Sequence, residues 1–463
     1  MSQAETIGAF GDQRRQDRGA WLLDRIVETG SLVIRKIGGG RAGEMAAHRF
    51  LASPEVTVGE IVETVGARAG GQCLGRRIVA VQDTSEINFN GRDAARRGLG
   101  AGANGEGCGF FMHPVIAVDA DDEAVIGLLD AQIWTRPQKA DGTACRQRRE
   151  RRLDDKESAR WLNGAIAAGQ RAAGARQLIV VGDRESDIYP LFARHPPHVD
   201  VLVRAAQDRA LEDGGLLFQK PAAWPCLGSY DVQVAPRGLG DRGRIAKVSV
   251  RAGTVRIKRP ANKGADRSDP AVLELTMVEA REEIPSPGQI PLLWRLVTTL
   301  PAETLEQAAD IVRLYRLRWR IEQTFRATKS DGLGLPDVQI QDAKRLLTLA
   351  AVALVAAVRT IQLVDARDGG ARPATDVVDE ELLDAAEAIG PTLEGKTARQ
   401  KNPHRARSLA WLAWIIARLG GWNCYYKPPG PKTMRSGWDR FAAMAAGYLI
   451  AHGRPLSPRR PLL

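Results

Sequence analysis

Two short apolar runs, each ending at an aspartate, most constrain the fold of this 463-residue chain. Residues 78–81 (IVAV) are separated from Asp83 by one residue, and residues 177–182 (QLIVVG) are followed directly by Asp183. Such uncharged runs predict buried strands, and residues 157–173 between them have the pattern of an amphipathic helix. In open α/β sheets, functional side chains gather at the carboxyl ends of the strands. An aspartate there can equally start a turn, so the pair matters more than either residue alone.

The remaining strand patterns predict a mixed sheet with an insertion. Residues 110–118 and 124–134 predict two further strands. Residues 227–287 then combine Gly and Arg with alternating Val and Ile, a pattern typical of short antiparallel strands. The run 292–298 resumes the α/β pattern, so a β-rich insertion is expected over approximately residues 205–290. A basic ribbon of this kind can grip a phosphate backbone, or it can be a solvated edge protected by charge.

Residues 304–331 predict one long helix, which begins with Thr304 and Gln307 spaced as a capping box. At about 100° per residue, four polar side chains fall within an arc of about 60°, next to an apolar stripe that would face a core. The four residues on the arc are Tyr315, Arg318, Glu322 and Lys329. A carboxylate among cations suits an enzyme that acts on phosphates, but ordinary ion pairs on a solvated helix give the same pattern.

Helical patterns precede this core. Residues 1–65 contain an amphipathic segment (FGDQRRQDRGAWLLDRIVETG) and two further helical runs, and predict a helical N-terminal domain. The amphipathic segment places Arg14, Arg15 and Arg18 on one side. The domain could read DNA ends through these arginines or could be a simple bundle, since its basic and acidic residues nearly balance.

Helical patterns also follow the core. Residues 344–364 predict an apolar helix that completes a central domain of residues 66–364. Residues 365–463 predict a helical C-terminal domain, with final helices at 405–419 and 438–451. These two helices contain more Trp, Leu and Ile than short helices usually bury alone, which favours self-association.

The charge distribution predicts a polyanionic partner. The net charge is +11, from 66 Lys and Arg against 55 Asp and Glu. Basic residues concentrate in residues 237–267 and 396–463, whereas residues 365–394 are acidic. Nucleic acid is the commonest partner of such basic blocks.

The five cysteines lie far apart without a CxxC motif, which fits a reducing compartment and argues against a cysteine-based zinc site. The longest uncharged apolar run, 346–358, is shorter than the ~20 residues that cross a bilayer. The sequence therefore predicts a cytoplasmic, nucleoid-associated protein without a membrane partner. The tail after residue 453 is rich in Pro and is expected to be mobile.

Together these motifs resemble the DDE transposases with an RNase H-like fold, specifically insertion-sequence family four. The Y-(2)-R-(3)-E-(6)-K signature of that family is present as Tyr315, Arg318, Glu322 and Lys329. The stretches AVQDTS, VVGDRESDIY, LWRLVTT and LYRLRWRIEQTF also resemble their equivalents in the family, as do GDQRR near the start and ARLGG near the end. The resemblance implies a multidomain α/β protein. An RNase H-like mixed sheet with an antiparallel insertion would lie between helical terminal domains.

The resemblance also implies a role for each site residue. The catalytic acids that hold the metal ions are Asp83, Asp183 and Glu322. Trp294 stands where the family stacks a flipped base, and Arg204 where it makes a further contact to the DNA end. The further expected DNA contacts are Tyr315, Arg318, Lys329, Arg326, Arg14, Arg15 and Arg18. From the residues alone, Trp294 could also be a core residue on a buried strand.

The implied activity is cut-and-paste transposition with two Mg²⁺ ions, which Mn²⁺ can replace. It proceeds by hydrolysis at the transposon end, hairpin formation, hairpin opening and strand transfer into target DNA. A homodimer would bridge two inverted-repeat ends. Two alternatives of other classes remain: a catalytically silent DNA-binding relative (an inhibitor or a domesticated protein) and a stand-alone metal-dependent nuclease or resolvase.

Overall fold

The computed structural model of the chain falls into two units. It describes residues 6–89, 98–102, 107–136, 153, 156–234, 243–261, 265–285, 290–329, 332–367, 369–370, 372–378, 380–425 and 428–454. The helix-rich unit comprises Met1–Leu74, Thr84–Ala140 and Arg320–Leu463, and the strand-rich unit comprises Gly75–Asp83 and Asp141–Trp319. The tail that we expected to be mobile lies mostly outside the described residues.

The strand-rich unit contains a mixed sheet, as the sequence predicts. Its strand order is β1-β6-β7-β11-β10-β9-β8, with β1, β6 and β7 parallel and each later pair antiparallel. The strands are β1 (Arg77–Gln82), β6 (Gln177–Gly182), β7 (Val199–Arg204), β8 (Gly228–Val234), β9 (Arg244–Lys258), β10 (Val272–Glu282) and β11 (Leu293–Thr298). The sequence analysis did not identify β7 as a strand. The mixed α/β architecture is confirmed and is consistent with an RNase H-like fold.

The parallel half of this sheet is uncharged and buried. All residues of β1 after Arg77 and all residues of β6 after Gln177 are buried, as is typical of parallel strands that are covered on both faces. The helix α6 (Ala159–Arg171) packs on both strands, and the short helix α7 (Tyr189–Arg194) connects β6 to β7.

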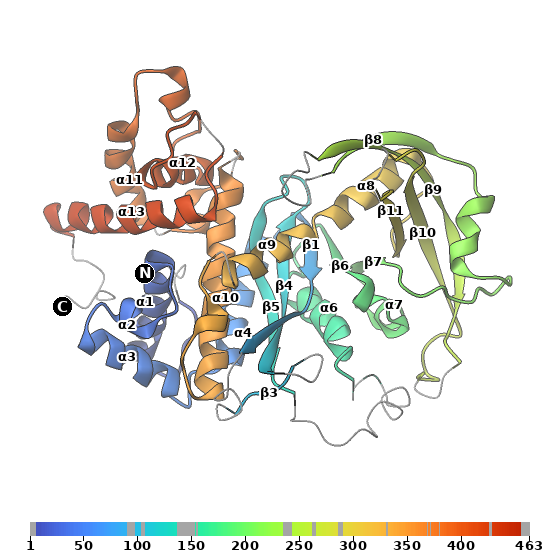
Figure 1. The fold of residues 1–463 in the computed structure, drawn as a ribbon, viewed down its shortest axis with the longest axis horizontal. Helices are drawn as coiled ribbons and strands as arrows, with labels where there is room; N and C mark the ends of the chain where they lie inside the picture. Colours follow the sequence, from blue (N-terminus) through green and yellow to red (C-terminus); the bar gives the residue numbers. More distant parts are fainter. Residues whose placement is uncertain are drawn as a thin grey trace. The chain divides into compact units, whose positions relative to one another are not determined.

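The antiparallel half is the predicted β insertion (Figure 1). The long strand β9 changes its buried face near its middle. Before Gly253 the even-numbered residues Ala246, Val248 and Val250 are buried, whereas beyond it Val255 and Ile257 are buried. A Cβ at Gly253 would lie 2.6 Å from the Trp224 ring, so this position requires the absence of a side chain.

The predicted single helix over residues 304–331 is wrong: the structure has two helices there. α8 (Leu305–Arg316) begins with the expected capping box of Thr304 and Gln307. α9 (Trp319–Thr328) follows after a break at Leu317 and Arg318, whose amides bond to the third residue before them rather than the fourth. Neither Pro nor Gly stands at the break, so the sequence gives no local signal for it. Residues 330 and 331, the expected end, lie outside the described residues.

The apolar stripe predicted for that helix is nonetheless buried. Leu314, Leu317, Ile321 and Phe325 expose at most 8% of their surface. The break does change the prediction for the four polar residues, because no single helix carries them. Tyr315 belongs to α8, Arg318 lies in the break, Glu322 belongs to α9, and Lys329 follows the end of α9.

The N-terminal part of the helix-rich unit has the expected helices: α1 (Gln13–Thr29), α2 (Ile34–Gly38), α3 (Arg41–Ala52) and α4 (Val58–Gln72). The side chain of Asp12 caps α1 and that of Thr57 caps α4. α4 continues through residue 65, where we expected a domain boundary.

The helix-rich unit also contains four antiparallel strands: β2 (Ser85–Phe89), β3 (Gly100–Ala101), β4 (Cys108–Asp119) and β5 (Val125–Trp134). β4 and β5 match the predicted strands, and their connecting turn is closed by the side chains of Asp119 and Asp122. β2 was not predicted.

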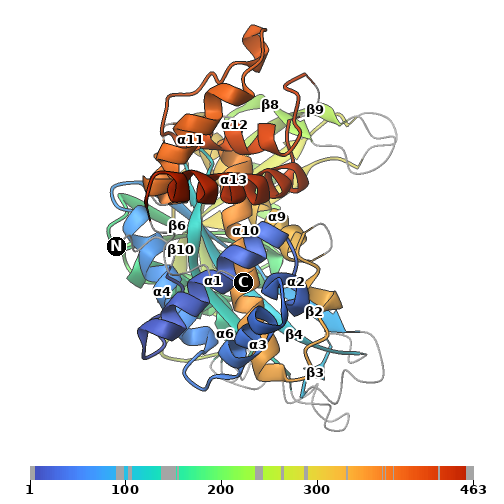
Figure 2. The same ribbon diagram turned by 90° about the vertical axis from the view of Figure 1, so that its left-hand side faces the viewer.

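α10 (Ala343–Ala366) is the central helix of the helix-rich unit and contacts α1, α4, α12, α13 and β5 (Figure 2). It confirms the predicted apolar helix over residues 344–364, and Arg359 within it pairs with Asp24 of α1 at 3.3 Å. Among the described helices it alone is long and apolar enough to cross a membrane, and 89% of its most apolar window is buried within the protein.

The C-terminal helices are α11 (Glu380–Leu393), α12 (Leu409–Leu419) and α13 (Pro431–Ala451). Our reason for expecting self-association through them holds only in part. α12 packs against α10, α11 and α13, and Trp411 and Trp414 expose only 8% and 4% of their surface. The chain itself therefore buries these tryptophans, whereas Met444 and Ile450 of α13 are 44% and 58% exposed, and the homodimer stays a prediction.

Candidate active site

Asp83 and Asp183 follow neighbouring parallel strands of the strand-rich unit. β1 and β6 pair in a constant register, from Arg77 opposite Gln177 to Val81 opposite Val181. Continued past the last strand residues, this register sets Asp83 level with Asp183. Because neighbouring strands lie about 4.8 Å apart, Asp83 and Asp183 follow adjacent strand ends at one end of the sheet. The structure thus brings together two residues that lie far apart in the sequence.

Asp83 is tied to the break between α8 and α9. Arg318 Nη1 donates to Asp83 Oδ2 over 3.1 Å, and the two side chains expose 13% and 17% of their surface. A partly buried guanidinium this close favours the ionised carboxylate. The arginine of the predicted signature therefore lies at the first of the predicted catalytic acids.

Asp183 begins a tight turn. Its Oδ1 accepts the amide of Glu185 over 2.8 Å, and its backbone oxygen accepts the Ser186 hydroxyl over 2.6 Å. A Cβ at Gly182 would come within 2.3 Å of that hydroxyl, so the turn requires glycine before the aspartate. Gly182, Asp183 and Ser186 of the motif Gly-Asp-Arg-Glu-Ser thus each have a structural reason.

The other two acids of this turn have different partners. Asp187, whose side chain is only 1% exposed, is bonded to Arg209 at 2.6 Å. Glu185 is 65% exposed and pairs with Arg160 at 2.8 Å. Asp183 is therefore the acid of this turn best placed to act together with Asp83.

Glu322 belongs to the helix-rich unit, in the first turn of α9. A carboxylate in the first turn is stabilised by the helix dipole. Arg326, one turn later, is exposed. The catalytic role of Glu322 stays a prediction.

The other two signature residues differ in exposure. Tyr315 is only 5% exposed, so its phenol is mostly part of the core. Lys329 is half-buried, and burial lowers its pKa although the charge of Glu86 acts in the opposite direction.

Arg204 and Trp294 lie on one face of the sheet. Arg204 is paired with Leu296, two residues from Trp294, and its Nη2 donates to the backbone oxygen of Leu293 over 3.2 Å. Trp294 packs against a buried cluster made of Val232, Ala246, Val248 and Leu292. The structure therefore gives Trp294 a packing role, and base stacking there stays a prediction.

The N-terminal arginines differ in what they contact. Arg15 donates to the backbone oxygen of Phe10 over 2.6 Å, which ties it to the start of α1. Arg18 lies 5.0 Å from the Trp21 ring, and burial lowers its pKa. Arg14 is exposed. Of the three, Arg14 is the most accessible to a phosphate.

Trp319 is a residue that the sequence analysis missed. Its indole is 58% exposed, and the guanidinium of Arg318 lies 5.8 Å from the ring. An exposed tryptophan next to Arg318 is a stacking surface near Asp83. Its place on the polar side of the predicted helix, away from the apolar stripe, was the available signal.

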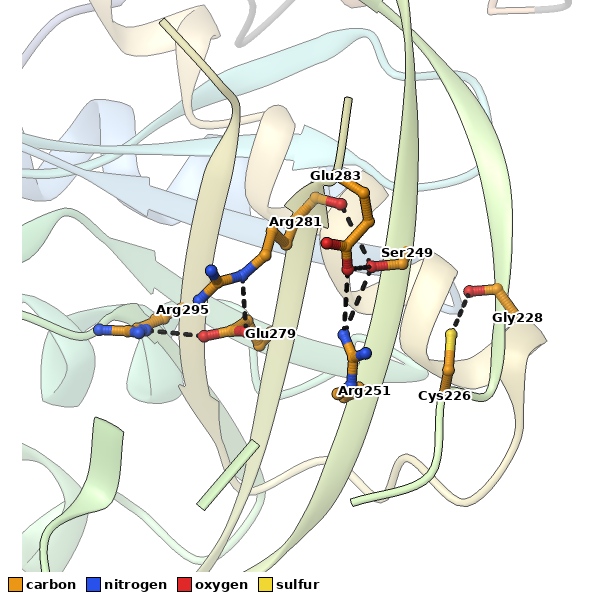
Figure 3. A network of polar contacts seen from close by, with 8 residues as sticks. All are labelled: Cys226, Gly228, Ser249, Arg251, Glu279, Arg281, Glu283 and Arg295. Atoms are coloured by element: carbon orange, nitrogen blue, oxygen red, sulfur yellow. Dashed lines mark hydrogen bonds and ion pairs between the residues drawn. The ribbon is translucent and has the colours of Figure 1, made fainter. Parts of the chain in front are cut away.

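Most arginines of the insertion are bonded to acids of the same sheet (Figure 3). Glu279, only 4% exposed, accepts from Arg281 and Arg295, and Glu283 accepts from Arg251. In addition, Arg244 pairs with Glu282 and Arg256 with Glu212. These pairs favour the charge-protected edge over the phosphate-gripping ribbon. Part of the basic block, residues 237–242 and 262–264, lies outside the described residues.

The carboxylate pair fits a hard divalent cation in its donor chemistry. Carboxylate oxygens are the ligands that Mg²⁺ and Mn²⁺ prefer, and Asp83 and Asp183 present two such groups at one sheet edge. Over the described part of the chain, no group of three or more His, Cys, Asp or Glu side chains is arranged to hold a metal ion. A complete site therefore needs a third carboxylate, for which Glu322 is the predicted source.

Comparison with known protein families identifies the central part of the chain. The family model described as the transposase DDE domain matches residues 83–358, more than half of the chain. The matched segment begins at Asp83 and includes Asp183 and Glu322.

Proposed function

This chain belongs to the family of transposase DDE domains, and we propose that it is a DNA transposase of insertion-sequence family four that works by cut and paste. The observation that carries the proposal is the parallel register of β1 and β6, which sets Asp83 level with Asp183. Two carboxylates at adjacent strand ends repel each other unless a cation lies between them or beside them. Arg318 supplies one positive charge beside Asp83, and a divalent cation would compensate the second carboxylate.

We assign the cation site to Asp83, Asp183 and Glu322. Two Mg²⁺ ions, or Mn²⁺ in their place, would supply the chemistry of in-line phosphoryl displacement, in which the attacking oxygen is activated and the leaving oxygen stabilised. The three carboxylates would orient the scissile phosphate through these ions. The Asp183 turn is held rigid by Ser186 and Glu185, which suits a residue that must keep one position during the reaction.

Arg318 is the residue that we propose to orient the phosphate next to Asp83. Its guanidinium carries five N–H donors, so it can keep the bond to Asp83 Oδ2 and also donate to a phosphate oxygen. Lys329 would add a positive charge, and the lowered pKa of its amine reflects a site that excludes water. Arg326 and Arg14, both exposed, are further candidates for the phosphate backbone.

The proposed reaction has four steps. Water first cleaves one strand at the transposon end and leaves a 3′-hydroxyl, which attacks the opposite strand and forms a hairpin. A second water opens the hairpin, and the freed 3′-hydroxyl attacks target DNA. Each step breaks one phosphodiester bond and, in the two transesterifications, forms another. Hairpin formation needs a sharply bent backbone, which an extruded base stacked on an indole such as Trp294 would relieve. A homodimer would hold the two ends together.

The test is incubation with Mg²⁺ and linear DNA that carries the flanking inverted repeats. Nicked and hairpin products should appear with wild-type protein. Glu322→Gln should lower cleavage by about a thousandfold or more while DNA binding persists, because loss of one metal ligand removes several kcal/mol of transition-state stabilisation. Glu306→Gln is the matched control, since Glu306 stands in the first turn of α8 as Glu322 does in that of α9.

The other outcomes separate the alternatives. End binding without cleavage would contradict the proposal in favour of a catalytically silent relative. Cleavage without preference for the inverted repeats would instead indicate a stand-alone nuclease. Full cleavage by Glu322→Gln would mean that the third acid lies elsewhere.

A further inference from the structure

Asp187 has the bonding pattern of a fully satisfied buried carboxylate. Its Oδ2 accepts the amides of Ala206 and Gln207, each over 2.7 Å. Its Oδ1 accepts from Arg209 Nη2 over 2.6 Å and from Arg209 Nε over 3.2 Å. Arg209 Nη2 also donates to the backbone oxygen of Asp187 over 2.7 Å. Four donors on one carboxylate leave little capacity for a metal ion.

This pair connects two segments that matter for the proposed function. Asp187 closes the turn that begins with Asp183, four residues earlier. Ala206, Gln207 and Arg209 belong to the segment that leads from the end of β7 into the β insertion. That segment is also fixed to β11, because the amide of Ala205 donates to the backbone oxygen of Arg295 over 2.8 Å. Asp187 therefore holds the Asp183 turn against the root of the insertion.

The backbone around Arg209 is held by hydrogen bonds as well. Its backbone oxygen accepts the amide of Leu217 over 2.9 Å, and the side chain of neighbouring Asp208 accepts the amide of Phe218 over 2.7 Å. The guanidinium thus extends from a fixed backbone, and its side chain is only 9% exposed. We infer that a buried ion pair with further hydrogen bonds on both partners fixes the local geometry more than it adds to the stability of the fold.

We propose that Asp187 and Arg209 form a positioning pair that holds Asp183 in place for the divalent cation, a role that rests on the proposed function. Asp187 acts through the turn and does not bind the metal ion. Loss of the pair loosens the turn and weakens metal binding at Asp183. Residues that support metal ligands typically change metal affinity by about 10- to 100-fold when mutated.

The test measures Mn²⁺ binding by the full-length protein, from the electron paramagnetic resonance signal of free Mn²⁺. Arg209→Met should weaken binding about tenfold or more. If Asp187 were itself a ligand, removal of Arg209 would release its carboxylate, and binding would be unchanged or tighter. The two roles therefore predict opposite results for one variant.

Arg209→Met leaves a buried carboxylate without its cation and could prevent folding. The double variant Asp187→Asn/Arg209→Met removes both charges and keeps the side-chain shapes, so it should fold and still bind Mn²⁺ about tenfold more weakly. Wild-type affinity in the folded double variant would overturn the proposal.

Arg194→Met is the matched control. Arg194 pairs with Asp266 and Asp269 in the same unit, away from the Asp183 turn, so its loss should leave Mn²⁺ affinity unchanged. Mn²⁺ binding and DNA cleavage by the wild-type protein distinguish failure of the proposed function from failure of the positioning pair. Absence of Mn²⁺ binding and of DNA cleavage in the wild type would refute the proposed function. Normal wild-type behaviour with unaffected variants would refute only the positioning pair.

Discussion

The two halves of the sheet in the strand-rich unit place their charges in opposite ways. β1 and β6 are buried and uncharged after their first residues, and their acids come directly after the strands. The antiparallel strands β9, β10 and β11 carry charges within the strands, and Glu279 is bonded to two arginines there (Figure 3). The first half places two acids at adjacent strand ends with one arginine, Arg318, bonded to Asp83, whereas in the second half a single acid, Glu279, is bonded to two arginines.

This difference separates function from structure. A buried acid between arginines completes a hydrogen-bond network and needs nothing further. Two aspartates at adjacent strand ends repel each other, and the single arginine bonded to Asp83 compensates only one of the two charges, an arrangement typical of an active site. We therefore expect substitutions in the first half to remove activity and substitutions in the second half to remove stability.

The largest effect is expected from a matched pair of neutral substitutions, Asp183→Asn and Glu279→Gln. Asp183→Asn should reduce Mg²⁺-dependent DNA cleavage by about a thousandfold or more, with no loss of stability, because it removes a metal ligand and a like-charge repulsion. Glu279→Gln should lower the free energy of unfolding by about 2–4 kcal/mol, because two arginines lose a buried partner. Cleavage assays and chemical denaturation measure the two effects.

An exchange of the two effects, on activity and on stability, would contradict this difference between the halves of the sheet. A strongly destabilised Asp183→Asn protein would make Asp183 a structural turn residue. A Glu279→Gln protein of normal stability but low activity would move part of the site into the insertion.

The sequence predicted the parallel half well because its signals are local. Runs such as IVAV and LIVV can form little other than buried strands, and an aspartate directly after each is visible by inspection. The register of β1 and β6 was not predictable, because it depends on how the two strands pair. The break at Arg318 was also not predictable, because neither Pro nor Gly marks it and Arg318 has the pattern of a helical residue.

In the insertion and the C-terminal helices, by contrast, the sequence did not reveal which residues contact each other. Composition identified a basic stretch after residue 236 and a Trp-rich pair of helices, but not the partners of those residues. The arginines of the insertion meet glutamates from neighbouring strands, and Trp411 and Trp414 meet other helices of the same unit. Surplus charge or apolar surface in a sequence therefore overstates what remains for a partner, because tertiary contacts use part of it first.

The next largest effect is expected from Glu282, on the way the free energy of unfolding depends on pH. Burial would raise the pKa of Glu282, but hydrogen bonds from Arg244 and the amide of Leu292, with the charge of Arg244, hold it below 4.5. A lowered folded-state pKa gives stability that is present above the unfolded-state pKa and is lost as the pH falls through the folded-state pKa. Glu282→Gln should therefore cost about 1.5–3 kcal/mol at pH 7, and the difference from wild type should shrink below about pH 4.5. Denaturation at several pH values measures it, and a constant difference would contradict this assignment.

The smallest effect is expected from Arg251→Gln, which tests whether the insertion contributes to DNA binding. Arg251 bonds to the half-exposed Glu283 at 3.3 Å, and such a pair contributes less than about 1 kcal/mol. If the insertion is a charge-protected edge, the variant should keep wild-type affinity for the transposon end and the same salt dependence. If the insertion grips the phosphate backbone, affinity should fall and the slope of log K against log salt should decrease by about 0.9. Arg14→Gln provides the contrast, because an exposed arginine that contacts a phosphate should change that slope. A reduced slope for Arg251→Gln with an unchanged slope for Arg14→Gln would reverse our assignment of the two basic regions.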